Sequence, residues 1–382
     1  MKQILQNLKS GETMVTEVPS PQVKRGHLKI KTNISLISAG TERMLVGFGK
    51  SNFIDKARQQ PEKVAQVLNK VSTDGLAATI DTVMTRLDEP QPLGYSNVGI
   101  VLEVGEGVEG YNVGDRVVSN GRHAEIVNVP HQLCAKIPEQ VSDEMAAFTV
   151  VSSIGLQGVR LANPTIGETV VVFGLGLIGL VTAQILKANG CKVLGLDVSE
   201  ERINMARSFG IEGVNLGQGA DPVAAAMAFS KGRGVDAVLI TASTKDDSIV
   251  SASAQMSRKR GRIVLVGVVG LKLNRADFYE KELSFQVSCS YGPGRYDPFY
   301  EEQGNDYPIG FVRWTEQRNF EAILEMMDAG QIVVEPMISL REEVCNAASA
   351  YDKVVSGEVI TVLLQYPDRV EQDVRTIKLV PN

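Results

Sequence analysis

Residues 169–197 read TVVVFGLGLIGLVTAQILKANGCKVLGLD, and this stretch decides the fold of the middle of the chain. The apolar run at 169–173 predicts a buried strand, and the apolar spacing after it predicts a helix through about residue 189. Residues 192–197 predict a second strand. The glycines between the first strand and the helix have the spacing GxGxxG. A strand, a glycine-rich turn and a helix in this order are typical of a dinucleotide-binding unit.

The three glycines and the acid that follows them predict a bound NAD. Gly174 permits a tight turn, Gly176 lets the backbone approach a pyrophosphate, and Gly179 lets the helix pack closely on the strand. The helix N-terminus favours a phosphate. Asp197 ends the second strand, where a carboxylate binds the ribose hydroxyls of NAD and repels the 2′-phosphate of NADP. The alternative is an ordinary glycine turn, with Asp197 capping the next helix.

Further apolar segments continue the alternation of strands and helices. Residues 236–240 and 262–266 predict strands, so we expect a parallel sheet covered by helices on both faces. Ligands of such sheets lie beyond the carboxyl ends of the strands. The candidate cofactor contacts are therefore Leu177 and Ile178 in the glycine turn and Thr241, Gly267 and Val268 after the later strands, although plain turn residues would give the same pattern there.

Composition and charge narrow the class of protein. The chain has 382 residues, of which 43% are hydrophobic and 22% charged, and this suits two globular domains. A net charge of −6 offers no basic stripe to nucleic acid, and no stretch is long and apolar enough for a membrane span. The cysteines are far apart and predict neither a disulfide framework nor a compact zinc site. We expect a cytoplasmic protein without a nucleic-acid or membrane partner.

The two ends of the chain have a different pattern from its middle. Residues 27–35 alternate apolar and polar side chains, and residues 94–130 are rich in Gly and Val, so both predict a β-rich domain. Helical spacing over 61–87, broken near residue 75, predicts a helical hairpin within an insert at 51–90. A helix over 316–329 and short final strands are also expected.

Two segments of the chain together resemble the medium-chain alcohol, sorbitol and threonine dehydrogenases. They are GYSNVGIVLEVGEGVEGYNVGDRVV at 94–118 and VVVFGLGLIGL at 170–180. The resemblance covers nearly the whole chain. It implies an α/β protein with a GroES-like catalytic domain, residues 1–151 and 290–382, and a Rossmann domain with a doubly wound parallel sheet, residues 152–289. It also implies a homo-oligomer.

The zinc ligands of that family are missing at the matching positions. Ala39 stands in place of the family's cysteine, Tyr95 in place of its histidine, and Thr149 or Val150 near its third ligand. Alanine cannot bind zinc, and neutral hydroxyls are poor ligands. The four-cysteine lobe for a structural zinc is also absent, so we predict no metal. Three histidines lie away from these positions and are predicted to be surface or loop residues: His27, His123 and His131.

More narrowly, the chain resembles a zinc-free bacterial subgroup of this family. Four segments carry this resemblance: ISAGTER at 37–43, RLDEPQPLGYSNVG at 86–99, and SYGPGRYDP and VRWTEQRN after residue 289. Its longer members are fused to a second oxidoreductase domain of the glucose-fructose oxidoreductase/inositol dehydrogenase type and are associated with sugar metabolism. The resemblance implies a sugar or nucleotide-sugar-like substrate. It also implies a second oxidoreductase domain as a partner or a fused unit.

Without zinc, hydrogen-bond donors and a general base must act on the reacting oxygen. Tyr95 is the candidate acid/base, because it stands where the resemblance puts the metal-binding histidine. Thr41 matches the family's proton-relay hydroxyl, and Glu42 matches an acidic position that is often structural. The alternatives are an aromatic plug for Tyr95 and a helix-capping hydroxyl for Thr41.

Aromatic and cationic side chains crowd into the loop-rich stretch after residue 289. Arginines bind phosphate or carboxylate in a bidentate manner, and aromatic rings stack on sugars or bases. A plain domain-crossing loop is the alternative. The candidate substrate residues are Tyr291, Arg295, Tyr296, Arg313 and Trp314.

The leading hypothesis is a metal-independent, NAD(H)-dependent oxidoreductase acting on a hydroxyl or carbonyl of a sugar-like substrate. One alternative is a zinc-free quinone or enoyl reductase. That class uses NADPH, whereas Asp197 favours NAD. Another is a non-catalytic dinucleotide-binding module that serves a partner oxidoreductase.

Overall fold

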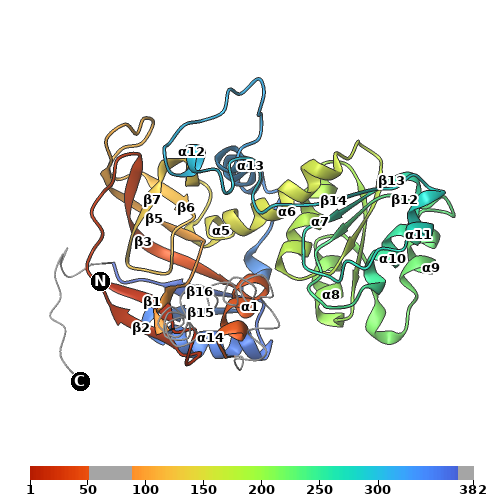
Figure 1. The fold of residues 1–382 in the computed structure, drawn as a ribbon, viewed down its shortest axis with the longest axis horizontal. Helices are drawn as coiled ribbons and strands as arrows, with labels where there is room; N and C mark the ends of the chain where they lie inside the picture. Colours follow the sequence, from red (N-terminus) through yellow and green to blue (C-terminus); the bar gives the residue numbers. More distant parts are fainter. Residues whose placement is uncertain (51–87, 369–382) are drawn as a thin grey trace, which may run out of the picture.

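The computed structural model describes residues 1–50 and 88–368, which form two bodies side by side joined through helix α6 (Thr149–Ala162) (Figure 1). The predicted helical hairpin at 61–87, and with it most of the expected insert, lies outside the described residues. Within the described ranges, no helix combines the length and the hydrophobicity needed to cross a bilayer.

The middle of the chain forms a six-stranded sheet in which all neighbouring strands are parallel, as predicted. The strand order is β11-β10-β9-β12-β13-β14. The chain adds β10 and β11 on one side of β9 and then returns to add β12, β13 and β14 on the other side, so the order of strands reverses beside β9. A ligand site is expected at such a point, beyond the carboxyl ends of the strands. The strands are β9 (Thr169–Phe173), β10 (Lys192–Asp197), β11 (Glu212–Asn215), β12 (Val235–Ile240), β13 (Ser257–Leu265) and β14 (Ser284–Val287).

Helices cover both faces of this sheet, and the four apolar residues of its central strand, 170–173, are buried on both sides. Alternate residues of β9 point to opposite faces. Val170 and Val172 belong to the core cluster that includes Leu180 of α7, whereas Val171 and Phe173 belong to the cluster under α9 and α10. The helices of this domain are α7 (Leu177–Ala188), α8 (Glu200–Ser208), α9 (Pro222–Phe229), α10 (Ser248–Met256) and α11 (Arg275–Tyr279), with the short η2 (Leu216–Gln218).

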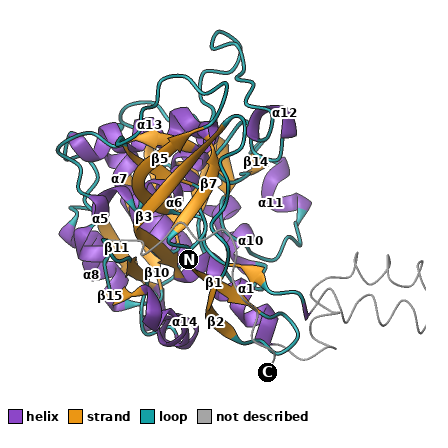
Figure 2. Ribbon diagram, turned by 90° about the vertical axis from the view of Figure 1, so that its left-hand side faces the viewer, coloured by secondary structure: helices purple, strands orange, loops and turns teal. Residues whose placement is uncertain are grey.

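The other domain contains a seven-stranded sheet built from both ends of the chain. Strand β16 pairs antiparallel with β3, and β5 pairs with the other side of β3. Figure 2 shows β3, β5 and β7 side by side in this sheet. The path is β15-β16-β3-β5-β6-β8, with β7 paired to β3. Its strands are β3 (His27–Ser38), β5 (Asn97–Val104), β6 (Arg116–Ser119), β7 (Ile126–Pro130), β8 (Cys134–Lys136), β15 (Leu340–Glu343) and β16 (Thr361–Gln365); a smaller sheet holds β2 (Thr13–Glu17), β1 (Lys2–Gln6) and β4 (Gln91–Pro92).

Helix α6 crosses the expected domain boundary at 151/152 and packs against both α7 and α13. It therefore ties the nucleotide-binding sheet to the catalytic body. The observed α13 agrees with the helix predicted at 316–329, whereas α14 was not expected. The remaining helices are α1 (Ala39–Lys50), α5 (Asp143–Ala146), α12 (Pro298–Glu301), α13 (Glu316–Asp328) and α14 (Ala347–Ser356), with η1 (His131–Leu133), η3 (Glu335–Met337) and η4 (Val344–Asn346).

Candidate active site

The glycine turn between β9 and α7 has the backbone geometry that a pyrophosphate site needs. Gly174 has φ +98°, a conformation that favours glycine. A Cβ on Gly179 would lie 1.9 Å from the carbonyl oxygen of Gly174, so a side chain does not fit there. Gly176 faces open space and is the N-cap of α7, without a side-chain cap. The N–H groups at Leu177 and Ile178 are therefore available to an anion.

Asp197 lies beside this turn with its carboxylate held in a fixed orientation. Its Oδ2 accepts a hydrogen bond from the backbone N–H of Leu175 at 2.6 Å, and its Oδ1 accepts one from Ser199 at 2.9 Å. A carboxylate has about four lone-pair sites, so acceptor capacity remains for a ligand. The sequence analysis did not single out Arg202, whose Nη1 lies 3.6 Å from Oδ2.

Two of the three later candidates shape the same region. Thr241 donates its hydroxyl to the carbonyl oxygen of Gly174 at 2.5 Å and so braces the turn. A Cβ on Gly267 would lie 2.2 Å from the carbonyl oxygen of Ala242, so this position allows only glycine. Val268 is 54% exposed after the end of β13. The turn, the carboxylate and these walls fit a dinucleotide.

Tyr95 lies in a short segment that the rest of the catalytic body holds firmly. Arg122 donates to the carbonyl oxygen of Gly94 at 3.1 Å, and the Ser96 hydroxyl donates to that of Ala147 at 2.7 Å. Gly94 has φ +94° and packs so closely on His123 that a Cβ would lie 2.5 Å from its backbone nitrogen. Tyr95 itself is half-buried against the main core cluster.

Two other phenols interact electrostatically with Tyr95. Burial raises the pKa of Tyr291 well above its ordinary value, and the nearby Tyr95 raises it further. The pKa of Tyr351 is raised by burial, then by Glu42, with a smaller contribution from Tyr95. Tyr95 therefore lies within electrostatic range of both the 291–296 loop and the buried interior of the catalytic domain.

Glu42 is completely buried in a polar network. Its Oε2 lies 3.1 Å from Nε2 of His123, and Tyr351 donates its hydroxyl to the same carboxylate. His123 Nδ1 lies 2.7 Å from the hydroxyl of Ser35, which is also hydrogen-bonded to Tyr366. His123 lies in the loop before β7, but its side chain is 0% exposed, so the expectation of an ordinary surface or loop histidine was wrong as to exposure. The side chain of Thr41 is outside those that the structure describes.

The positions that match the family's zinc ligands hold no set of metal donors. Ala39 and Val150 have no ligating atom, and Tyr95 and Thr149 present neutral hydroxyls. Thr149 is fully buried, and its Oγ1 has no hydrogen-bond partner in the described structure. Across the described ranges, no three His, Cys, Asp or Glu side chains are grouped as a metal site would require. These residues do not fit a catalytic zinc.

The loop after β14 holds three of the predicted substrate residues close to one another. Tyr291 is 5% exposed, and its hydroxyl donates to Asn120 at 3.2 Å. The guanidinium of Arg295 lies 5.3 Å from the ring centroid of Tyr291 and 4.2 Å from that of the exposed Tyr296. Arg295 also forms a 2.6 Å ion pair with Glu301. Tyr291, Arg295 and Tyr296 therefore form one cluster.

A buried acid that the sequence analysis did not identify lies beside this cluster. The side chain of Glu316 is 0% exposed and lies beside the carboxylate of Glu301. Burial, and then the charge of nearby Glu301, raise the pKa of Glu316 to about 9. Glu316 is therefore a neutral acid at physiological pH. The TEQRN segment gave no sign of this, because an exposed glutamate is equally common at the first turn of a helix.

Arg313 and Trp314 belong to a different group. The guanidinium carbon of Arg160 lies 3.4 Å from the ring centroid of Trp314, and the guanidinium carbon of Arg313 lies 3.8 Å from the same centroid. These residues lie at helices α6 and α13, where Arg160 also donates to Asn319 at 2.7 Å. The predicted substrate residues thus divide between two places.

Two family models match the chain. Residues 66–139 match the alcohol dehydrogenase GroES-like domain, and residues 178–302 match the model described as zinc-binding dehydrogenase. The described part of the first segment, residues 88–139, falls in the β-rich body, and most of the second segment falls in the parallel-sheet domain.

Curated relatives and solved structures agree with this assignment. The chain is 30% identical to D-guloside 3-dehydrogenase of Escherichia coli over 273 residues, which cover 69% of this chain and 73% of the relative. It is 29% identical to (R,R)-butanediol dehydrogenase of Bacillus subtilis over 238 residues, 54% of this chain and 68% of that one. Galactitol-1-phosphate dehydrogenase of Escherichia coli has the same fold, with a TM-score of 0.73 over 96% of this chain and all of that one, at 19% identity.

The fold and the glycine turn define a two-domain oxidoreductase with a GroES-like domain and a Rossmann domain. The chain belongs to the medium-chain dehydrogenase/reductase family.

Proposed function

We propose that this protein is an NAD(H)-dependent oxidoreductase that interconverts a hydroxyl and a carbonyl on a polyol or sugar-like substrate without zinc. The carboxylate of Asp197, fixed by Leu175 beside the open N-terminus of α7, is the observation that carries the proposal. The substrate class is supported by relatives whose names describe action on D-guloside and D-xylulose.

The chain's own residues would hold the cofactor at three points. The N–H groups that follow Gly176 bind the pyrophosphate, and Asp197 accepts hydrogen bonds from the adenosine ribose. Thr241 keeps the turn in the binding conformation. When bound, the nicotinamide supplies the acceptor for hydride in alcohol oxidation and the donor in carbonyl reduction.

Tyr95 is proposed to hold the proton that the substrate oxygen gains or loses. In reduction its phenolic O–H donates the proton to the carbonyl oxygen, and in oxidation the phenolate takes the hydroxyl proton back. Tyr291, which interacts electrostatically with Tyr95, and Arg295, which lies over the ring of Tyr291, are proposed to bind the substrate, with Tyr296 at the exposed edge. Glu42 is proposed as a positioning residue, because its buried carboxylate contacts Tyr351 and His123. We keep Thr41 as a proposed relay.

Metal independence rests on the donor atoms at the matching positions. A zinc in this family's place would need nitrogen, sulfur or carboxylate ligands, and Ala39, Tyr95 and Thr149 offer none. Hydrogen-bond donors are therefore proposed to stabilise the charge on the reacting oxygen.

A second candidate function is an NADPH-dependent quinone or enoyl reductase. Arg202 favours it, because this guanidinium lies near the Asp197 carboxylate with a side chain that is 40% exposed. An arginine at this place accommodates the 2′-phosphate of NADP. An acryloyl-coenzyme A reductase of Metallosphaera sedula is 30% identical over 48% of this chain and 62% of that relative.

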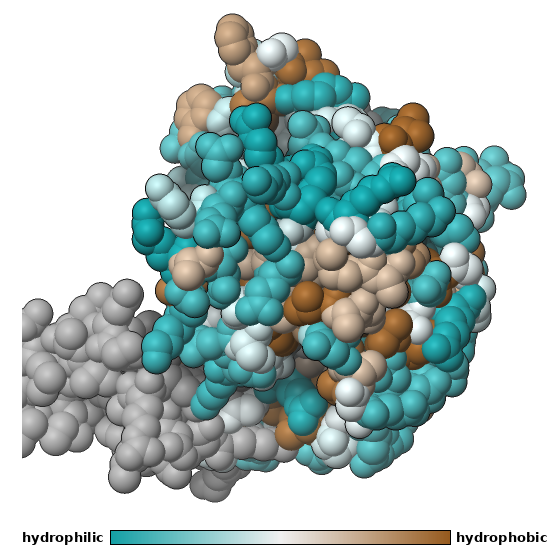
Figure 3. Space-filling view, turned by 90° about the vertical axis from the view of Figure 1, so that its right-hand side faces the viewer, coloured by the Kyte–Doolittle hydropathy of each residue, from teal (hydrophilic) through white to brown (hydrophobic). Residues whose placement is uncertain are grey.

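We also propose that the protein is a homo-oligomer that pairs through the β14 edge. Strand β14 is the last strand of the six-stranded sheet, and its edge is unpaired within the described chain. Figure 3 shows the end of the molecule that the parallel-sheet domain forms, where hydrophobic side chains are exposed among hydrophilic ones. Five large apolar residues that are more than half exposed lie within residues 268–287, which lead into β14: Val268, Leu271, Leu273, Tyr279 and Val287.

A parallel titration with NADH and NADPH, followed by turnover assays with polyols and sugars, tests the proposed function. Tighter binding of NADH, with turnover of a polyol, is the expected result. Tighter binding of NADPH would replace the proposal by the reductase alternative. Binding without turnover of any hydroxyl or carbonyl substrate would indicate a dinucleotide-binding module that serves a partner or fused oxidoreductase.

A further inference from the structure

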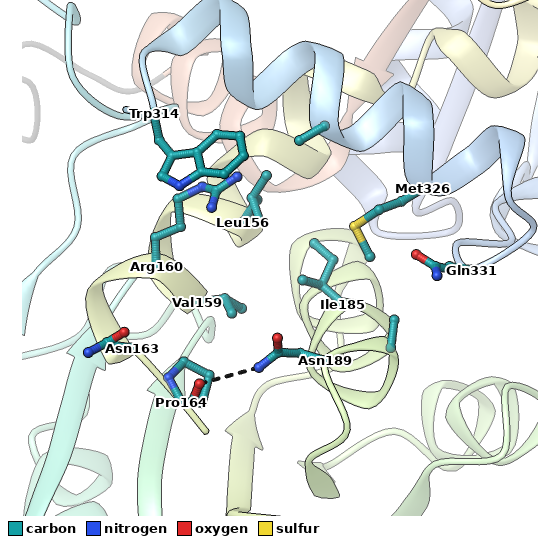
Figure 4. Close-up of a pocket in the computed structure, with 12 residues that line it drawn as sticks. Leu156, Val159, Arg160, Asn163, Pro164, Ile185, Asn189, Trp314, Met326 and Gln331 are labelled. Atoms are coloured by element: carbon teal, nitrogen blue, oxygen red, sulfur yellow. Dashed lines mark hydrogen bonds between the residues drawn. The ribbon is translucent and has the colours of Figure 1, made fainter. Parts of the chain in front are cut away.

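A pocket of about 460 Å³ lies between α6, α7 and α13, at the end of α7 opposite the glycine turn (Figure 4). Trp314 and Arg160 form one wall. Figure 4 shows Val159, Ile185 and Met326 lining the space between the three helices. Asn163, Asn189 and Gln331 border it and are exposed. The proposed hydride-transfer chemistry uses none of these residues.

The cationic wall of this pocket has an unusual charge arrangement. The guanidinium carbons of Arg160 and Arg313 both lie within 3.8 Å of the centroid of Trp314. Two groups this close to one centroid would overlap on a single face, so the indole is sandwiched between them. Each contact is a favourable cation–π interaction. However, the arrangement holds two like charges on either side of one ring.

Within the described ranges no carboxylate forms an ion pair with Arg160 or Arg313, and the carboxylate of Glu321 interacts with Arg313 only at longer range. Arg160 has a neutral partner, the amide oxygen of Asn319 at 2.7 Å. Burial, and then the charge of Arg313, lower the pKa of Arg160 to about 10. A partly buried positive charge without a counter-charge favours binding of an anion.

We propose that this pocket binds a small anionic molecule with an apolar body, such as a carboxylate or phosphate monoester on a short alkyl chain. The guanidinium of Arg160, supported by Arg313, would bind the anionic group. The apolar body would pack on Leu156, Val159, Ile185 and Met326, which line the pocket. Because the pocket contacts α7 at its C-terminal end, the anion site is separate from the pyrophosphate turn at the N-terminal end.

Trp314 is the only tryptophan of the chain, so the fluorescence of the unmodified protein reports on this site. The probes are octanoate and octyl phosphate, with octanol as the neutral control and inorganic phosphate as the control without an apolar body. We expect a saturable change in tryptophan emission with octanoate, octyl phosphate or both, and the tighter of the two identifies the anionic group. Equal binding of octanol, or no saturable change with either anion, would overturn the proposal.

Substitution of the two arginines tests whether the anion binds at this pocket. Arg160→Gln is expected to weaken the affinity roughly tenfold or more, because it removes the charged partner of the anion. Arg313→Gln is expected to weaken the affinity less, because Arg313 lies behind the indole and supplies only a supporting charge. The matched control is Arg260→Gln, whose side chain is 81% exposed and remote in sequence, and it should bind as the wild type does. Arg313 is itself exposed, so Arg313→Gln remains informative if Arg160→Gln fails to fold. Unchanged affinity in Arg313→Gln would contradict the site.

A second arm separates this pocket from the dinucleotide site. The octyl phosphate titration is repeated with saturating ADP, which contains the adenosine and pyrophosphate parts of the cofactor. Octyl phosphate that still binds supports the separate site, whereas displacement by ADP would place the anion at the glycine turn and overturn the proposal.

Discussion

The carboxylate of Asp197 accepts a 2.6 Å hydrogen bond from the backbone N–H of Leu175, inside the glycine turn itself. The residue that would bind the ribose is thus also a structural part of the phosphate-binding turn. Its side chain is only 6% exposed, so its orientation is settled before any ligand arrives. Such pre-organisation reduces the ordering cost of binding.

Replacement of Asp197 by asparagine should separate these two roles. In Asp197→Asn the side-chain oxygen can still accept from Leu175, but the amide nitrogen cannot accept from the backbone N–H of Ser199, so the thermal midpoint should fall only modestly. The charge is lost, so NADH affinity should fall roughly tenfold or more while NADPH affinity is unchanged or improved. Parallel fluorescence titrations measure both. Equal losses for the two cofactors would show that Asp197 does not contact the ribose.

Removal of the phenolic hydroxyl at Tyr95 should affect the chemical step. Tyr95→Phe keeps the ring that packs on the core, so NADH affinity should not change. The value of kcat should fall by about 10²–10⁴-fold, the usual contribution of a general acid–base group. Tyr279→Phe is the control, because that tyrosine is 64% exposed and stacks on Arg275. An unchanged kcat in Tyr95→Phe would mean that the ring only fills space.

Removal of metal should leave the enzyme active. The positions of Ala39, Tyr95 and Thr149 offer no ligand that competes with a chelator for zinc. We expect elemental analysis to find far less than one zinc per chain, and dialysis against EDTA to preserve turnover and NADH binding. One zinc per chain together with loss of turnover in EDTA would refute metal independence.

The sequence was most informative where structure depends on neighbouring residues. The strands predicted at 169–173 and 192–197 have the observed bounds, because a short apolar run bounded by turn residues encodes a buried strand locally. Helix α14 was missed, although Ala347, Ala350, Tyr351 and Val354 are its buried residues at helical spacing. The helical spacing of apolar residues is present in the sequence, but it covers only a short segment.

Sequence reasoning was weakest where a site depends on residues far apart in the chain. The partners of Glu42 are His123 and Tyr351, which are separated from it by 81 and 309 positions. Similarly, nothing near Trp314 in the sequence indicates that Arg160 stacks on its ring. Such contacts depend on the packing of whole elements, such as α6 against α13, and no local pattern encodes that packing.

Glu316 should make the protein less stable as the pH rises. Its pKa is about 9 in the folded chain, against an ordinary value of 4.5, because it is buried near Glu301. Between these two values the native state holds a proton that the unfolded state has lost. The free energy of unfolding therefore falls with rising pH across this window, by at most about 1.4 kcal/mol per pH unit from this group.

Replacement of Glu316 by glutamine removes this titration while keeping the shape of the side chain. Glu316→Gln should therefore lose stability less steeply than the wild type between pH 5 and pH 8. Urea unfolding at several pH values in this range measures the difference. Glu325→Gln, at an exposed position of the same helix, is the matched control and should follow the wild-type slope. Parallel slopes for Glu316→Gln and the wild type would show that Glu316 is already ionised in the native protein.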